Sequence, residues 1–109
     1  MELTFGALQA YLFEHYGGVA NEQGMFMKLV EEIGEVAEVL NKRAGRKANE
    51  EEDLQTELAE ELADMIHYIV AIAAINNIDL TGTIIDKDKR AAVKYRHARD
   101  LEAFLNAEK

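Results

Sequence analysis

Two short acidic motifs have the residue types and spacing to do chemistry. Glu32-x-x-Glu35 and Glu61-x-x-Asp64 each lie inside an apolar segment. The two 13-residue segments that hold them align without a gap, with acid opposite acid at three positions and apolar opposite apolar at most of the others. The chain therefore contains an internal repeat built on an acid-acid-x-x-acid pattern.

Helical geometry places each acidic pair beside an apolar stripe. At about 100° per residue, Glu35 lies about 300° round the helix from Glu32, and Glu61 and Asp64 take the same two angles. The stripes that we expect to join the two helices lie between roughly 40° and 100° on each wheel: Leu29, Ile33, Val36 and Leu40, then Leu58, Leu62, Met65 and Ile69. Antiparallel packing would bring the four carboxylates together at one edge of the interface. Three other acids point towards solvent: Glu31, Glu38 and Glu60.

Four converging carboxylates repel one another unless a cation lies between them. A hard divalent ion with oxygen ligands suits this donor set, Mg²⁺ first and Mn²⁺ second, and Mg²⁺ in such sites also binds substrate phosphates. The competing interpretation is an acidic amphipathic helix pair with solvated flanks. A di-iron bundle is disfavoured, because it needs Glu-x-x-His on two helices and the chain offers only Asp64-x-x-His67.

Apolar periodicity predicts helices throughout the chain and no strand. The first helix is capped by Thr4 and ends near Tyr16, and residues 19–24 are expected to form a loop. The remaining helices are expected at residues 25–44, at residues 54–75 and after a cap at Asp79 or Thr81, with residues 46–53 as a polar linker. An amphipathic piece at residues 101–105 either continues the last of these helices or packs separately. The predicted fold is an all-α bundle of four to five helices in a single domain over residues 1–109.

Composition excludes several classes of protein. The chain has 109 residues, 49% of them apolar, which is typical of a globular domain. No Cys is present, which rules out a disulfide scaffold and a thiolate zinc site. A net charge of −9 argues against a nucleic-acid partner. With no secretory signal and no apolar segment long enough for a membrane span, we expect a cytoplasmic protein without a membrane partner.

The motifs resemble those of a known family. Residues 28–35 (KLVEEIGE) and 60–64 (EELAD) look like the paired E-x-x-E and E-x-x-D metal motifs of the MazG-like all-α nucleoside triphosphate pyrophosphohydrolases. The resemblance covers most of residues 25–96. It implies Mg²⁺-dependent hydrolysis of a nucleoside triphosphate, foremost a deoxynucleotide, to the monophosphate and pyrophosphate. It also implies assembly as a homodimer or a dimer-based homotetramer.

The same resemblance implies roles for individual residues. Glu32, Glu35, Glu61 and Asp64 would be the metal ligands, and Lys87 would face the substrate phosphates, so these five residues are the expected catalytic set. Many members of the family have Asn four residues after that Lys, where this chain has Ala91.

Other functions remain open at this point. One alternative is a helical module that binds nucleotides or a partner without turnover, another is an enzyme similar to phosphoribosyl-ATP pyrophosphohydrolase, and a third is a purely structural acidic bundle. His67 is expected to pack between helices, and Tyr68 either orients a ligand oxygen or packs at an interface. Met25, Phe26 and Met27 are expected to pack in the core or between subunits, with a nucleobase pocket as the alternative.

Overall fold

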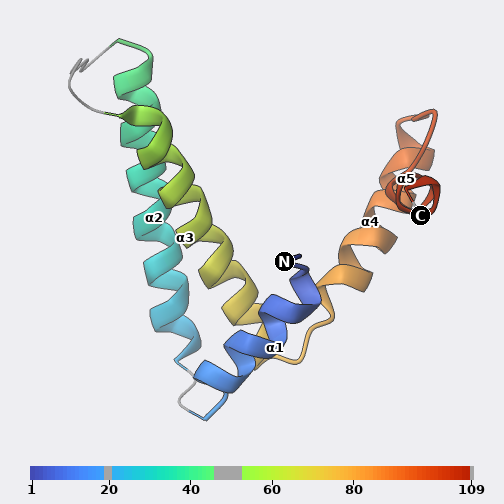
Figure 1. The fold of residues 1–109 in the computed structure, drawn as a ribbon, viewed down its shortest axis with the longest axis horizontal. Helices are drawn as coiled ribbons and strands as arrows, with labels where there is room; N and C mark the ends of the chain where they lie inside the picture. Colours follow the sequence, from blue (N-terminus) through green and yellow to red (C-terminus); the bar gives the residue numbers. More distant parts are fainter. Residues whose placement is uncertain (19–20, 46–52, 109) are drawn as a thin grey trace.

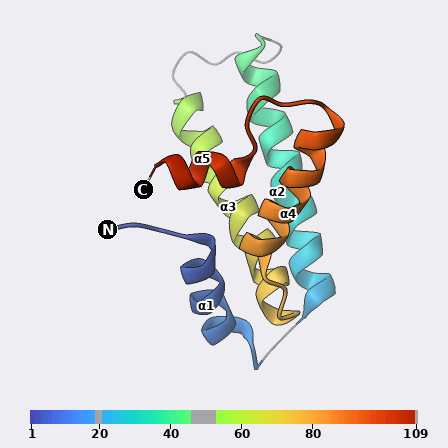
Figure 2. The same ribbon diagram turned by 90° about the vertical axis from the view of Figure 1, so that its right-hand side faces the viewer.

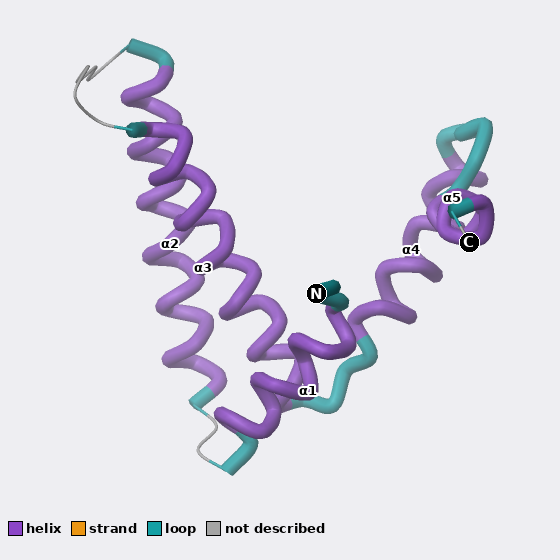
Figure 3. Tube along the Cα trace, in the orientation of Figure 1, coloured by secondary structure: helices purple, strands orange, loops and turns teal. Residues whose placement is uncertain are grey.

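A computed structural model describes residues 1–18, 21–45 and 53–108. These residues form five helices and no strand (Figures 1 and 3). The helices are α1 (Phe5–Tyr16), α2 (Glu22–Arg43), α3 (Leu54–Ile75), α4 (Leu80–Lys94) and α5 (Leu101–Ala107). The all-α prediction is confirmed.

Every helix begins at a side chain that caps it. The cap accepts a hydrogen bond from the backbone N–H of the third helical residue, which satisfies one of the free amides at the helix start. The five caps are Thr4, Asn21, Asp53, Asp79 and Asp100. Asn21 starts α2 three residues earlier than expected, so the prediction of a loop at residues 22–24 was wrong. Residues 19–20 and 46–52 of the expected loop and linker lie outside the described residues.

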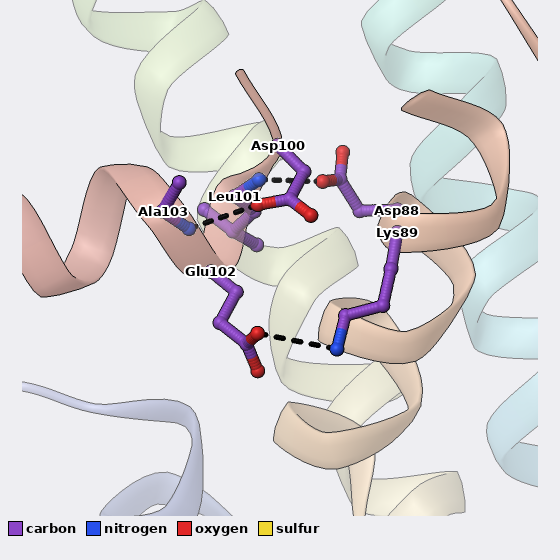
Figure 4. Close-up of polar contacts among 6 residues, drawn as sticks. All are labelled: Asp88, Lys89, Asp100, Leu101, Glu102 and Ala103. Carbon is purple, nitrogen blue, oxygen red and sulfur yellow. Dashed lines mark hydrogen bonds and ion pairs between the residues drawn. The ribbon is translucent and has the colours of Figure 1, made fainter. Parts of the chain in front are cut away.

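α5 is a separate helix that packs against the end of α4. The chain reverses after α4, where Arg96 has a left-handed φ of 55°. The Asp88 carboxylate accepts a hydrogen bond of 2.6 Å from the Leu101 backbone N–H, and Lys89 forms an ion pair of 3.1 Å with Glu102 (Figure 4). These two contacts fix the start of α5 on α4.

The helices of one chain form an open V (Figure 1), which Figure 2 shows from the side of α4 and α5. The antiparallel hairpin α2–α3 is one arm, α4 and α5 are the other, and α1 packs against α3 at the vertex. The core lies there, around Leu12, Met25 and Val70. Gln9 joins α1 to the α3–α4 connection, since its amide donates to the Ile78 carbonyl at 2.6 Å and accepts from the Leu80 N–H at 3.0 Å.

The hairpin interface is rotated relative to the predicted stripe. Met25 and Val39 are the buried residues of α2, each 7% exposed, whereas Ile33 and Leu40 are each 48% exposed. Because Met25, Glu32 and Val39 are seven residues apart, they share one face of the helix. The face centred on Glu32 therefore meets α3. Part of the apolar stripe that was expected to join the helices, including Ile33 and Leu40, therefore lies along the side of the hairpin, whereas Leu29 and Val36 are partly buried as expected.

Among the described residues, no single helix has both the length and the apolar character to cross a membrane. α3 and α4 meet those criteria only as a pair, and they are bent by 105° at the break between them.

Candidate metal centre

Three of the four predicted ligands come together where α2 and α3 face each other. Glu32, Glu61 and Asp64 each offer one carboxylate oxygen, and these oxygens lie within 4.8 Å of one another. Glu32 and Glu61 are partly buried in the helix interface, whereas Asp64 lies at its edge and is exposed. The cluster is therefore open to solvent, and to a ligand, on the side of Asp64.

Glu35 lies beside the same cluster. The Glu35 and Glu32 carboxylates lie within hydrogen-bonding reach of Glu61 and, together with burial, raise the pKa of Glu61 to about 8. The cause is repulsion between three adjacent negative charges, which is relieved when one of the carboxylates holds a proton. The site accordingly carries a proton that a cation would displace.

Unpartnered oxygens support a cation at this place. One oxygen each of Glu32, Glu57 and Glu61 is buried without a hydrogen-bond partner. A buried carboxylate oxygen is costly without a partner, and a hard divalent cation accepts several such oxygens as ligands. The carboxylates present therefore fit Mg²⁺ or a similar ion.

Glu57 is a candidate that the sequence motif did not single out. It lies on α3 one turn before Glu61, on the same side of the helix, and its orphaned oxygen is buried. The signal was available in the four-residue spacing of two acids on one helix face. The family motif begins after this position, so Glu57 was left out.

The raised pKa of Glu61 predicts how stability depends on pH. Between the ordinary value of 4.5 and about 8, the folded state holds a proton that the unfolded state has released. Stability of the metal-free protein should therefore fall as pH rises through this window and level off above it. Mg²⁺ should oppose the fall by binding the native state, so its effect on the melting temperature should grow with pH.

Thermal melts with a chelator and with excess Mg²⁺, across this pH range, measure both effects. The amide that Glu61→Gln introduces cannot ionise. This variant should therefore flatten the pH dependence of the melting temperature without metal, and remove most of the rise in melting temperature with Mg²⁺. An equal Mg²⁺ response in the wild type and in Glu61→Gln would count against the site.

The structure does not bring Lys87 to the carboxylates. Lys87 lies on α4, in the arm of the V opposite α2 and α3 (Figure 1). Its basic neighbours have local partners: Lys89 pairs with Glu102, Arg90 pairs with Asp86 at 3.5 Å, and Lys94 lies 5.3 Å from the ring centre of Tyr95. These contacts favour a structural role for the three neighbours.

The aromatic neighbours of the site are ordered by α1. His67 forms a hydrogen bond of 2.8 Å with the Tyr16 hydroxyl, as expected for a histidine that packs between helices. The His67 ring also meets Tyr68 edge-on, with ring centres 4.9 Å apart. Tyr68 is partly buried and lies close enough to Lys28 to affect its pKa.

Three successive apolar residues in the second turn of α2 separate into two environments. Met25 belongs to the core, as predicted. Phe26 and Met27 are more than half exposed and line a surface pocket of about 530 Å³ with Glu22, Gln23 and Ile72.

Comparison with known proteins identifies similar sequences and folds. The sequence model of one protein family, the MazG nucleotide pyrophosphohydrolase domain, matches residues 20–98. These residues include all four carboxylates and Lys87. The chain is also similar to iMazG from Vibrio DAT 722, whose crystal structure is solved, with 30% sequence identity and a TM-score of 0.65. That match covers 89% of this chain and 100% of the other. The comparison with curated proteins gives no match.

Proposed function

Because the chain belongs to the MazG nucleotide pyrophosphohydrolase family, we propose that it hydrolyses a nucleoside triphosphate, foremost a deoxynucleotide, to the monophosphate and pyrophosphate with Mg²⁺ bound. Mn²⁺ is the second choice of metal. The observation that carries the proposal is the cluster of Glu32, Glu61 and Asp64 oxygens within 4.8 Å of one another on two facing helices.

Each residue of the site has a proposed role. Glu32 and Glu61 would hold the metal from within the helix interface, and Asp64 and Glu35 would complete the set from its edge. When bound, Mg²⁺ supplies a positive charge for the triphosphate oxygens and lowers the pKa of a water. Water is the nucleophile in this proposal, so the protein supplies no covalent nucleophile.

The proposed reaction breaks one phosphoanhydride bond. A water oxygen forms a bond to the α-phosphorus, and the bond from that phosphorus to the oxygen bridging it to the β-phosphorus breaks. The electron pair leaves with pyrophosphate, one water proton stays on the new hydroxyl group of the monophosphate, and the other passes to solvent.

Pyrophosphate release across a panel of ribonucleotides and deoxynucleotides, with Mg²⁺, Mn²⁺ or chelator, tests this function. We expect metal-dependent release of pyrophosphate with at least one deoxynucleotide. Metal-dependent binding without turnover would favour a binding module instead. Turnover confined to phosphoribosyl-ATP would assign the chain to the related activity.

The assembly that we propose is a homodimer or a dimer-based homotetramer. The apolar stripe along the side of the hairpin is exposed to about the same degree on both helices. It consists of Val30, Ile33 and Leu40 on α2 and Leu62, Ile66 and Ile69 on α3. An exposed apolar stripe of this kind marks a protein interface. A second copy is the best occupant, because two such hairpins can bury matching stripes against each other around a twofold axis.

Light scattering should show a mass at least twice the 12.3 kDa of one chain at micromolar concentration. Ile33→Lys places a charge in the proposed interface and should shift the protein towards monomer. Glu38→Lys, on the exposed side of the same helix, is the matched control and should leave the mass unchanged. A wild-type monomer would overturn this assembly.

Lys87 would then serve the site of another copy. In one chain α4 and the carboxylates lie on separate arms, and the family resemblance assigns Lys87 to the phosphates. Lys87 can reach the carboxylates if α4 of one copy enters the V of another copy. This arrangement would pair a basic helix with an acidic hairpin. Lys87 would supply positive charge to the triphosphate as its bond to the leaving group breaks.

A further inference from the structure

A lysine other than Lys87 lies on the hairpin itself, at one end of the carboxylate cluster. Lys28 precedes Glu32 by one helical turn, or about 6 Å along the axis, and its angle on the wheel falls between those of Glu32 and Glu35. Among the described residues of the hairpin, the other two cations are Lys42 and Arg43. They lie at the opposite end of α2, about 15 Å or more from Glu32 along the axis.

The surroundings of Lys28 come from both helices. Its ammonium group lies 3.4 Å from the Glu31 carboxylate. Glu31 raises the pKa of Lys28 above its usual value, through a hydrogen bond and through its negative charge. Tyr68 and Glu32 raise this pKa further. Tyr68 lies on α3 and Glu32 on α2, so charges on both helices act on the ammonium group. It is therefore a permanent positive charge beside the acidic cluster.

The ion pair with Glu31 does not explain the position of Lys28. Both side chains are 56% exposed and three residues apart on one helix. Exposed pairs of this kind contribute little to stability, because water screens them and the long side chains lose freedom when they pair. The ammonium group can exchange Glu31 for a more highly charged partner at small cost.

We propose that Lys28 binds the pyrophosphate end of the substrate, the β- and γ-phosphates. This rests on the proposed function. The α-phosphate would lie over the carboxylates, and the leaving group would extend one helical turn towards the start of α2. As the bond to the α-phosphorus breaks, the electron pair moves onto pyrophosphate, and the Lys28 ammonium group stabilises that added charge. Lys28 would thus be a catalytic residue that fixes the direction in which the triphosphate lies.

Binding of the two products separates this role from a structural one. Titration calorimetry with pyrophosphate in excess Mg²⁺ should show that Lys28→Met loses about tenfold or more in affinity, the size of one charge-assisted contact. Its affinity for a nucleoside monophosphate should stay within about twofold of the wild type, since that product lies at the other end of the cluster. Lys28→Arg keeps the charge and should recover most of the pyrophosphate affinity.

Glu31→Gln is the matched control, because it breaks the same ion pair but keeps the lysine. It should bind pyrophosphate at least as tightly as the wild type. An equal loss in Glu31→Gln and Lys28→Met would mean that the ion pair matters only for local structure, and would overturn the proposal. Equal pyrophosphate affinity in Lys28→Met and the wild type would overturn it as well.

Failure of the proposed function would look different. The rise in melting temperature with Mg²⁺ alone should persist in Lys28→Met, because the carboxylates are intact. A wild type that shows no rise with Mg²⁺ would refute the metal site and with it the inference about Lys28. A wild type that shows the rise but does not bind pyrophosphate would refute the inference about Lys28 alone.

Discussion

Glu35→Gln should lower pyrophosphate release by orders of magnitude, whereas Glu38→Gln should change it only slightly. Both glutamates are exposed on α2 and lie three residues apart. Glu35 is within hydrogen-bonding reach of Glu61 across the helix interface, and Glu38 points further towards solvent on the helical wheel. Gln keeps the size and hydrogen bonding of the side chain but removes the negative charge that a hard cation needs.

The expected size of the loss follows from the role of the metal. Metal stabilisation of developing charge contributes several kcal/mol to such reactions, and about 1.4 kcal/mol changes a rate tenfold. Turnover of both variants should be measured at saturating Mg²⁺ on the best wild-type substrate. Comparable losses in the two variants, or a larger loss in Glu38→Gln, would show that the proposed site is on the wrong face of α2.

A mixture of two inactive variants should recover activity if Lys87 acts on the site of another copy. Lys87→Ala and Glu61→Gln should each lose about a hundredfold in turnover, because each removes charge that stabilises the transition state. In a mixed dimer, one of the two sites combines intact carboxylates with an intact Lys87. Random pairing should therefore restore about a quarter of the wild-type sites.

The two variants should be unfolded and refolded together, and the turnover compared with that of each variant refolded alone. A mixture of Glu61→Gln with Glu35→Gln is the matched control, since both variants damage the same set of carboxylates and no complete site can form. If the first mixture stays at the average of its two components, Lys87 does not act between copies.

Local patterns predicted the helices well because each helix carries its own signals. Asp79 and Asp100 cap α4 and α5 as side chains of this type do, and Asn77, with a left-handed φ of 55°, follows the end of α3 as Asn often does. The start of α2 was misplaced because the pattern of apolar residues begins at Met25. The helix itself begins at the Asn21 cap, and its first turn carries polar side chains.

The arrangement of the helices was harder to predict than their ends. Leu40 and Val39 are neighbours in an apolar segment, and either could have faced α3. Only the packed hairpin shows that Val39 is buried and that Leu40 is exposed. A single sequence also gives no signal for the V, because the separation of α4 from the hairpin depends on contacts between distant residues.

The carboxylate site was predictable to the extent that it depends on one pair of helices. Glu32, Glu61 and Asp64 meet because their spacing repeats on two antiparallel helices. Lys87 could not be placed in the same way, since it lies on α4 in the other arm. The roles of these residues, the metal and the assembly stay predictions, as does a single domain over residues 1–109.

Hydrolysis in ¹⁸O-labelled water tests most directly whether water attacks the α-phosphorus at the carboxylate site. With Mg²⁺ and the best triphosphate, mass spectrometry should find one labelled oxygen in the monophosphate and none in the pyrophosphate. Glu61→Gln, treated in the same way, should form little of either product. Label in the pyrophosphate, or release of a nucleoside diphosphate and phosphate, would show attack at another phosphorus and would contradict the proposed mechanism.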